Sequence, residues 1–214
     1  MTLSPIEADG VIAVVRLDDL SRAVPLTEAL VAGGVRAVEF TFTNPAAAAA
    51  IAAARDGLGE RALIGAGSVL DGETARVAIL AGAAFVVTPT VSLPTIAICN
   101  RYGVATTIGA LTPTEILTAW EAGATYVKVF PASLGGPRYL RDVHGPLPQV
   151  KLIPTGGVDL DNAGEFIRAG AVAIALGSNL VDARSVATED WDTITTRARA
   201  LVAAVDRARQ PMRA

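Results

Sequence analysis

The fold of this chain is indicated by the stretch EAGATYVKVFP at residues 121–131, whose pattern of a helix end followed by a strand recurs along the chain. Its first half is typical of a helix end, because a glycine just past the last turn adopts the left-handed conformation that closes the helix. Its second half is typical of a buried strand, since it is short, apolar and rich in β-branched and aromatic residues. Similar helix-ending phrases surround Gly33, Gly82 and Gly170. The sequence therefore predicts a chain of alternating helices and strands.

Eight such strands start 19 to 26 residues apart, which is the length of one strand, one helix and two short loops. They are predicted at residues 11–17, 37–42, 63–69, 85–90, 104–109, 126–131, 151–156 and 173–178. Helix starts are marked by a capping sequence at Thr112 and by acidic first turns at residues 71–73 and 159–161. An apolar face at helical spacing in residues 190–209 predicts a closing helix.

Eight strand and helix units in 214 residues predict an α/β fold, a single-domain (β/α)8 TIM barrel over residues 1–214 with a short N-terminal helix. An open, doubly wound sheet is the alternative. The barrel is favoured because the count is eight, and because no G-x-G-x-x-G phrase follows the first strand.

The composition argues against several classes of function. A net charge of −3 with no basic block offers no surface for a nucleic-acid backbone, and the apolar runs are too short to span a membrane. Residues 1–10 lack the basic region that precedes the apolar core of a signal peptide, so we expect a cytoplasmic protein. One cysteine and one histidine cannot build a thiolate or imidazole zinc site, although the composition leaves carboxylate-bound Mg²⁺ or Mn²⁺ open.

The chain contains only two lysines, Lys128 and Lys151. Alternation along the strands places Lys128 on the face opposite Val127 and Val129, so that it points into the barrel, and the same reasoning applies to Glu39. Burial disfavours the charged form of a lysine, lowers its pKa and leaves the free amine that Schiff-base chemistry requires. The alternative is a buried ion pair between Lys128 and Glu39 that only orders the core. Lys151 begins a strand at the opposite end, where a structural role is expected.

Other candidate site residues lie where strands end, at the edge that holds the active site in such barrels. Arg16 offers a guanidinium suited to a substrate carboxylate, or it braces a loop through Asp18 or Asp19. Glycine-bearing turns at residues 154–158 and 176–179 follow the last two strands, where backbone N–H groups commonly hold a phosphate. Glycine also serves tight turns, so each turn has a purely structural interpretation as well.

The phrase YVKVFPA at residues 126–132 resembles the lysine strand of the 2-keto-3-deoxy-6-phosphogluconate / 4-hydroxy-2-oxoglutarate aldolase family, class I enzymes on a small (β/α)8 barrel. The other phrases that resemble this family are VIAVVR at residues 11–16, VE at 38–39, GAGSVL at 65–70, VTP at 87–89, TPTE at 112–115, PTGGV at 154–158 and GS at 177–178. The resemblance covers nearly the whole chain.

The resemblance implies a role for each matching position. Lys128 would form a Schiff base with the 2-oxo carbon, and Glu39 would act as general acid and base on the hydroxyl whose deprotonation breaks the carbon–carbon bond. The residues implied at the pyruvate end are Arg16, Ser68, Pro89, Phe130 and Thr155, and those implied at the distal phosphate are Gly156, Gly157, Gly177 and Ser178. The resemblance also implies a small-molecule 2-oxo acid substrate, no metal or other cofactor, and a homotrimer.

One substrate-binding position departs from the family pattern. Many phosphogluconate-type members have an arginine four residues after the glutamate, where it contacts the substrate carboxylate, and here that position is Thr43. The phrases NP at residues 44–45 and GGPRY at 135–139 look closer to the branch that cleaves 6-phosphogalactonate derivatives.

The resemblance therefore predicts a class I aldolase that reversibly cleaves a 2-keto-3-deoxy-6-phospho-sugar acid, of the phosphogluconate or phosphogalactonate type. Its products would be pyruvate and glyceraldehyde 3-phosphate. The alternatives are a 4-hydroxy-2-oxoglutarate aldolase that gives pyruvate and glyoxylate, and a non-catalytic barrel that binds a sugar phosphate.

Overall fold

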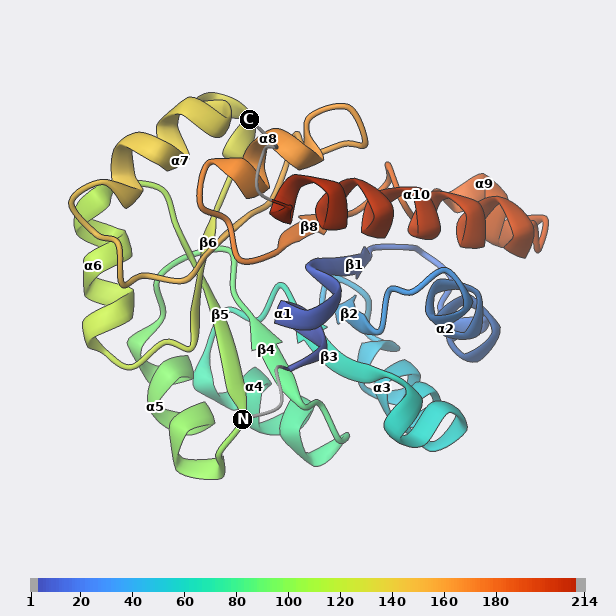
Figure 1. Ribbon diagram of the computed structural model, residues 1–214. Coiled ribbons are helices and arrows are strands. Elements are labelled where there is room, and N and C mark those ends of the chain that lie inside the picture. The colour runs from blue at the N-terminus through green and yellow to red at the C-terminus, as the bar shows by residue number, and fades with distance from the viewer. Residues whose placement is uncertain (1–3, 211–214) are drawn as a thin grey trace.

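The computed structural model describes residues 4–210, and in it eight parallel strands form one sheet that closes on itself (Figure 1). The strands are β1 (Val11–Val15), β2 (Ala37–Thr41), β3 (Leu63–Gly67), β4 (Phe85–Val87), β5 (Ala105–Ala110), β6 (Tyr126–Val129), β7 (Leu152–Pro154) and β8 (Ile174–Leu176). β1 pairs with both β2 and β8, and a bridge between Thr155 and Ala175 links the end of β7 to β8. The predicted (β/α)8 barrel is confirmed. The ends of the predicted 1–214 domain, residues 1–3 and 211–214, lie outside the described residues.

Helices surround the sheet and cover its outer face (Figure 1). They are α1 (Pro5–Asp9), α2 (Ala23–Ala32), α3 (Ala47–Leu58), α4 (Gly72–Leu80), α5 (Leu93–Tyr102), α6 (Pro113–Glu121), α7 (Gly136–His144), α8 (Ala163–Arg168), α9 (Ala183–Ala187) and α10 (Trp191–Arg209), with 3-10 turns η1 (Gly59–Arg61) and η2 (Ala132–Leu134). The predicted short N-terminal helix is α1, and the predicted closing helix is α10. No helix in residues 4–210 combines the length and the apolar character needed to cross a membrane.

The helix ends follow the glycine pattern of the sequence. Gly34, Gly82, Gly123 and Gly170 each lie two residues past the end of a helix and have φ between +93° and +105°, a conformation that residues with a Cβ rarely adopt. The capping box at Thr112 is also present, because its hydroxyl accepts from the backbone of Glu115 and the Glu115 carboxylate accepts from the backbone of Thr112.

One predicted helix start is wrong. The acidic stretch at residues 159–161 precedes α8 and does not form its first turn, because α8 begins at Ala163. The Asp159 carboxylate accepts hydrogen bonds from the backbone N–H groups of Asp161 and Asn162, so it closes a turn in the loop before the helix.

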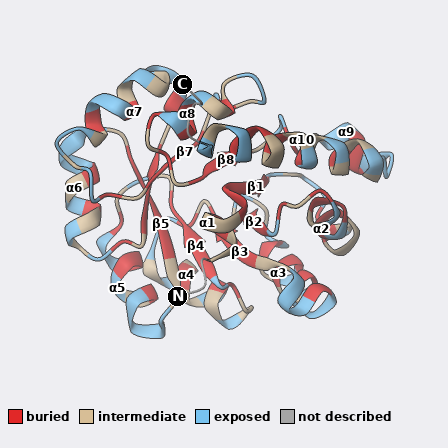
Figure 2. Cartoon of the chain, viewed as in Figure 1, coloured by how far each residue is buried: buried red, intermediate tan, exposed pale blue. Residues whose placement is uncertain are grey.

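Strand alternation divides the buried side chains into two cores. Val38 and Phe40 of β2 face outward and belong to the large cluster between sheet and helices, whereas Ala37 belongs to the smaller cluster inside the barrel. Figure 2 shows the strands buried and the outer faces of the helices exposed. The strand registers place Glu39, Val87, Lys128 and Ala175, from β2, β4, β6 and β8, in one interior layer. Glu39 and Lys128 therefore project from opposite walls of the barrel.

The helix α1 closes the end of the barrel at which the strands begin. Ile6 is buried within the interior cluster. The Glu7 carboxylate accepts a hydrogen bond of 2.9 Å from the Tyr126 hydroxyl and one of 2.8 Å from Lys151 Nζ. Because Tyr126 begins β6 and Lys151 directly precedes β7, Glu7 ties the bases of both strands to α1. This arrangement fits the structural role expected for Lys151.

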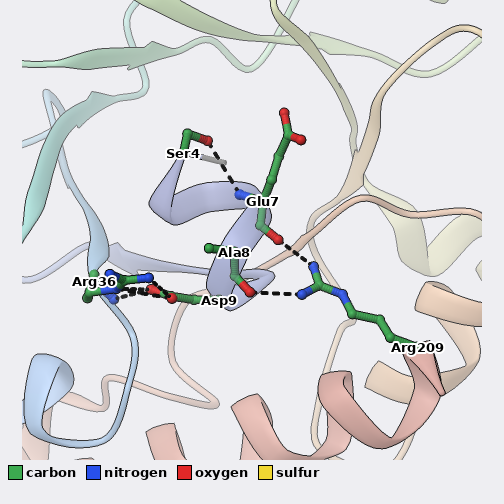
Figure 3. Close-up of polar contacts among 6 residues, drawn as sticks. All are labelled: Ser4, Glu7, Ala8, Asp9, Arg36 and Arg209. Atoms are coloured by element: carbon green, nitrogen blue, oxygen red, sulfur yellow. Dashed lines mark hydrogen bonds and ion pairs between the residues drawn. The ribbon is translucent and has the colours of Figure 1, made fainter. Parts of the chain in front are cut away.

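Two further contacts hold α1 in place, and Figure 3 shows both. The Arg209 guanidinium, at the end of α10, donates to the backbone carbonyls of Glu7 and Ala8. Asp9 forms an ion pair with Arg36, which directly precedes β2. The carbonyls of a helix C-terminus carry partial negative charge, so the Arg209 guanidinium is favourably placed there.

We expect Glu7→Gln to lower the free energy of unfolding by about 0.5–1 kcal/mol at pH 7, the size typical of a partly exposed ion pair. Hydrogen bonding to Lys151 holds the pKa of Glu7 below its usual value of 4.5. Its contribution is therefore fully present above about pH 4.5 and is lost as the pH falls further. Urea unfolding at pH 7 measures the loss. Asp56→Asn, which breaks an exposed pair with Arg55, is the control and should change little; equal stabilities for Glu7→Gln and the parent would contradict the prediction.

Candidate active site

A pocket of about 260 Å³ opens where the strands end, at the edge of the barrel opposite α1. Its walls come mainly from β1, β6 and the loops after β7 and β8. Eight of the predicted site residues line it: Arg16, Lys128, Phe130, Thr155, Gly156, Gly157, Gly177 and Ser178. The other lining residues have no role predicted from the sequence, and they are Val14, Val158, Ala175, Leu176, Asn179 and Val181.

Lys128 and Glu39 are both almost fully buried, with 5% and 1% of their surface exposed. Within residues 4–210 they form neither a hydrogen bond nor an ion pair within 4 Å, so the close ion pair considered as the alternative is not formed. Lys128 Nζ instead lies 4.9 Å from the centre of the Phe130 ring.

Burial perturbs both ionisable groups in the barrel. It lowers the pKa of Lys128, and the positive charge of Arg16 acts in the same direction, whereas Glu39 opposes the change. It raises the pKa of Glu39, against the pull of Lys128 and Arg16. Both shifts favour the neutral forms, because a low-dielectric interior penalises each charge. A lysine in this state is more readily available as a nucleophilic free amine.

Space for the Glu39 carboxylate is provided by a glycine on the next strand. A Cβ at Gly67 would lie 2.6 Å from Glu39 Oε1, and no side chain fits there without displacing the carboxylate. Gly109 has a similar relation to Pro89, since a Cβ at Gly109 would lie 2.3 Å from the Pro89 carbonyl carbon. Gly109 is also the register partner of Lys128. The sequence showed these glycines, but not that they leave room for the site.

Arg16 lies just past β1 with an exposed side chain at the mouth of the pocket. Its guanidinium is 3.5 Å from Ser68 Oγ, and it forms no ion pair with Asp18 or Asp19 in the described part of the chain. The loop-bracing alternative is therefore not seen. Thr43 does not line the main pocket. It lines an adjoining hollow with Arg16, and its hydroxyl is 2.9 Å from that of Thr41.

Several polar groups in the pocket have no protein partner. The Thr155 hydroxyl is buried and makes no hydrogen bond in the structure, and the same is true of Thr107, one interior layer below Lys128. Gly156 and Gly157 have φ of +83° and +78°. Successive residues in such a turn present their N–H groups to one concave surface that suits an anion. Buried polar groups are normally paired, so a polar ligand is the natural partner here.

Metal binding was left open by the composition. Among residues 4–210, no group of three or more His, Cys, Asp or Glu side chains is arranged to hold a metal ion.

Comparison with known proteins agrees with this geometry. Residues 4–197 match the family model described as KDPG and KHG aldolase. The chain is 41% identical over 191 residues to a 2-dehydro-3-deoxy-phosphogluconate aldolase of Treponema pallidum (strain Nichols), covering 89% of this chain and 90% of that one. It is 35% identical over 170 residues to the 2-dehydro-3-deoxy-6-phosphogalactonate aldolase of Escherichia coli (strain K12), covering 79% and 83%.

Solved structures give the same result. A structure described as native KDPGal superposes with a TM-score of 0.86 at 32% identity, covering 92% of this chain and 95% of that one. A KDPG aldolase from Legionella pneumophila, with pyruvate captured as a covalent carbinolamine, superposes with a TM-score of 0.85 at 28% identity, covering 93% and 98%. Fold and site together define a carbon–carbon lyase on a (β/α)8 barrel. The chain belongs to the KDPG and KHG aldolase family.

We expect Lys128→Met to stabilise the protein at pH 7 by about 1 kcal/mol or more, raising the Tm by about 2–4 °C. Folding lowers the pKa of Lys128 from its usual 10.5, so the Lys128 amine binds a proton more readily in the unfolded chain than in the folded protein. The free-energy cost of burying the amine is therefore present at neutral pH. That cost disappears as the pH rises toward 10.5. Calorimetry at pH 7 and pH 10 measures the difference. Lys151→Met, which removes a partner of Glu7, is the control and should not stabilise; a lower Tm for Lys128→Met at pH 7 would contradict the prediction.

Proposed function

We propose that this protein catalyses the reversible cleavage of a 2-keto-3-deoxy-6-phospho-sugar acid to pyruvate and glyceraldehyde 3-phosphate through a Schiff base on Lys128. The observation that carries the proposal is the buried Lys128 amine with a lowered pKa, which lies at a pocket where the loops after β7 and β8 present backbone N–H groups that have no acceptor among the described residues. The names of the related aldolases of both sugar-acid types support the same reaction class.

The chemistry begins when the neutral Lys128 amine attacks the 2-oxo carbon. Neutral Glu39 gives up its proton, directly or through a water, so that the carbinolamine hydroxyl leaves as water, and this step gives a protonated imine and the Glu39 carboxylate. Glu39, as the carboxylate, then removes the proton from the C4 hydroxyl, directly or through a water. The C3–C4 bond breaks, its electron pair moves into the imine to form an enamine, and glyceraldehyde 3-phosphate departs as the aldehyde. Protonation of the enamine at C3 and hydrolysis of the imine release pyruvate and restore the amine.

The substrate carboxylate is assigned to Arg16 and Ser68, whose side chains lie 3.5 Å apart. This assignment accounts for Thr43, which stands where many relatives have an arginine. Arg16 and Thr43 line the same hollow beside the pocket. Arg16, which directly follows β1, therefore supplies the positive charge that an arginine at position 43 would bring to the substrate carboxylate. The unpartnered Thr155 hydroxyl and Phe130, which both line the pocket, are assigned to the rest of the pyruvate end. Pro89, which the family resemblance implies there, is not among the residues that line this pocket.

The distal phosphate is assigned to Gly156 and Gly157 in one loop and to Gly177 and Ser178 in the other. The N–H groups that these loops leave unpaired favour a phosphorylated substrate over 4-hydroxy-2-oxoglutarate, which carries no phosphate. The two sugar-acid types differ only in the configuration of one carbon, and we propose the class that includes both.

Borohydride reduction in the presence of pyruvate should trap a covalent adduct on the peptide that contains Lys128. We expect Lys128→Ala to lose the adduct and to reduce kcat by at least about a thousandfold, since Lys151, the other lysine of the chain, is partly exposed and lies at the α1 end of the barrel. Peptide mass spectrometry locates the adduct. Lys151→Gln should keep both the adduct and the activity. Pyruvate binding without a trappable adduct would instead indicate a non-catalytic sugar-phosphate-binding barrel.

We also infer that the protein self-associates into a homotrimer through the face formed by α4 and α5. Large apolar side chains are exposed on these helices and just before α4: Leu80 ends α4, Leu93 begins α5 and Leu70 precedes α4, and 67%, 52% and 65% of their surfaces are accessible. A groove between the two helices, lined by residues that include Arg76 and Ile98, runs through this face. Exposed apolar patches of this kind commonly mark protein–protein contacts. A related structure is described as a cage designed from fused symmetric oligomeric domains.

Light scattering after size-exclusion chromatography should give three times the mass of the chain. We expect Leu80→Asp to yield a folded species of lower mass, because a charge buried at an apolar interface is costly. Leu160→Asp changes a leucine of similar kind in the loop before α8 and should leave the mass unchanged. A monomeric parent protein, or a trimeric Leu80→Asp variant, would refute this assignment.

A further inference from the structure

Two loops meet at the rim of the pocket, and a side chain outside the predicted site joins them. Val158 belongs to the loop after β7, and Asn179 belongs to the loop after β8. Asn179 Nδ2 donates a hydrogen bond of 2.9 Å to the backbone carbonyl of Val158. Both residues also line the pocket. This bond connects segments 21 residues apart in the sequence, and no pattern in either segment predicts it.

A second asparagine orients the same loop from its other side. Asn162 Nδ2 donates a hydrogen bond of 2.9 Å to the Gly157 carbonyl, and Asn162 Oδ1 accepts one of 3.0 Å from the backbone N–H of Asp159. In a trans peptide the carbonyl and the following N–H point in opposite directions. Because Asn162 holds the Gly157 carbonyl, the N–H of Val158 is directed away from Asn162.

The N–H groups of both loops are free to bind a ligand. In residues 4–210, none of the backbone N–H groups of Gly157, Val158, Ser178 and Asn179 donates to a protein acceptor, and all four residues line the pocket. Carbonyl oxygens would repel an anion, and two of those in the β7 loop are bound by asparagine side chains. The loops therefore present donors to the pocket.

Side-chain cations cannot replace these donors. Among the described residues that line the pocket, the cations are Arg16 and Lys128, which the proposed function assigns to the substrate carboxylate and to the 2-oxo carbon. The second anionic group of the substrate is left to backbone N–H groups from two separate loops. The affinity of the protein for this second anionic group must then depend on how accurately the two loops are placed relative to each other.

We propose that Asn179 is a positioning residue for the distal phosphate: by holding the Val158 carbonyl, it locks the β7 and β8 loops together so that their N–H groups converge on one phosphate. The inference depends on the proposed function, because it assumes a phosphorylated substrate. It adds to that function a residue that sets selectivity for the phosphate without reacting itself.

The test compares KM and kcat for a 2-keto-3-deoxy-6-phospho-sugar acid and for its unphosphorylated counterpart in the parent protein and in Asn179→Ala. We expect the KM for the phosphorylated substrate to rise about three- to tenfold, the effect of losing one neutral hydrogen bond. Its kcat should stay within about twofold, and both constants for the unphosphorylated substrate should stay unchanged. Asn179→Asp should raise the KM further, because a carboxylate cannot donate to Val158 and repels phosphate.

Asn100→Ala is the matched control, since Asn100 Nδ2 makes the same kind of bond, 3.3 Å to the Gly123 carbonyl, outside the pocket. It should change neither substrate's KM. The inference is overturned if Asn179→Ala leaves the KM for the phosphorylated substrate unchanged, if both substrates are affected equally, or if the parent protein does not prefer the phosphorylated substrate. Failure of the proposed function appears separately, as a parent protein that neither cleaves these acids nor forms a borohydride-trapped adduct at Lys128.

Discussion

The structure depends on holding an amine inside a closed barrel. Lys128 projects from β6 into an interior otherwise filled largely by apolar side chains, and the loss of solvation lowers its pKa. Glu39 projects from the opposite wall and limits that cost, but the two groups do not form a close ion pair. An intimate pair would hold the lysine protonated, whereas separation leaves an amine that can react. Gly67 makes this arrangement possible by leaving room for the carboxylate.

The two ends of the barrel differ in how their polar groups are satisfied. At the α1 end, Tyr126 and Lys151 both donate to the Glu7 carboxylate, so the polar groups of this end satisfy one another within the protein. At the other end, the Thr155 hydroxyl and the N–H groups of Gly157, Val158, Ser178 and Asn179 have no protein partner among the described residues. Unpaired polar groups cost stability, and they are retained where a ligand completes them. The same chain thus separates the end that stabilises the fold from the end that holds the pocket.

Much of the fold follows from local rules in the sequence. The left-handed glycines after four helices and the capping box at Thr112 appear as predicted, because these motifs depend only on residues within a few positions of each other. All strands but β5 end one to three residues earlier than predicted, since the apolar runs continue into loops that leave the ladder. The start of α8 was misplaced because the Asp159 carboxylate caps a turn before the helix as readily as it could cap the helix itself.

The sequence by itself determined the number of βα units, the inward orientation of the Lys128 and Glu39 side chains, and the positions where loops could present N–H groups to an anion. These follow from periodicity, which is a local property of the chain. Only the tertiary structure decided that Lys128 and Glu39 lie on opposite walls, that Arg16 and Thr43 share a hollow, and that Asn179 reaches the Val158 carbonyl. Such relations depend on the register and closure of eight strands, and no segment of the sequence encodes them alone.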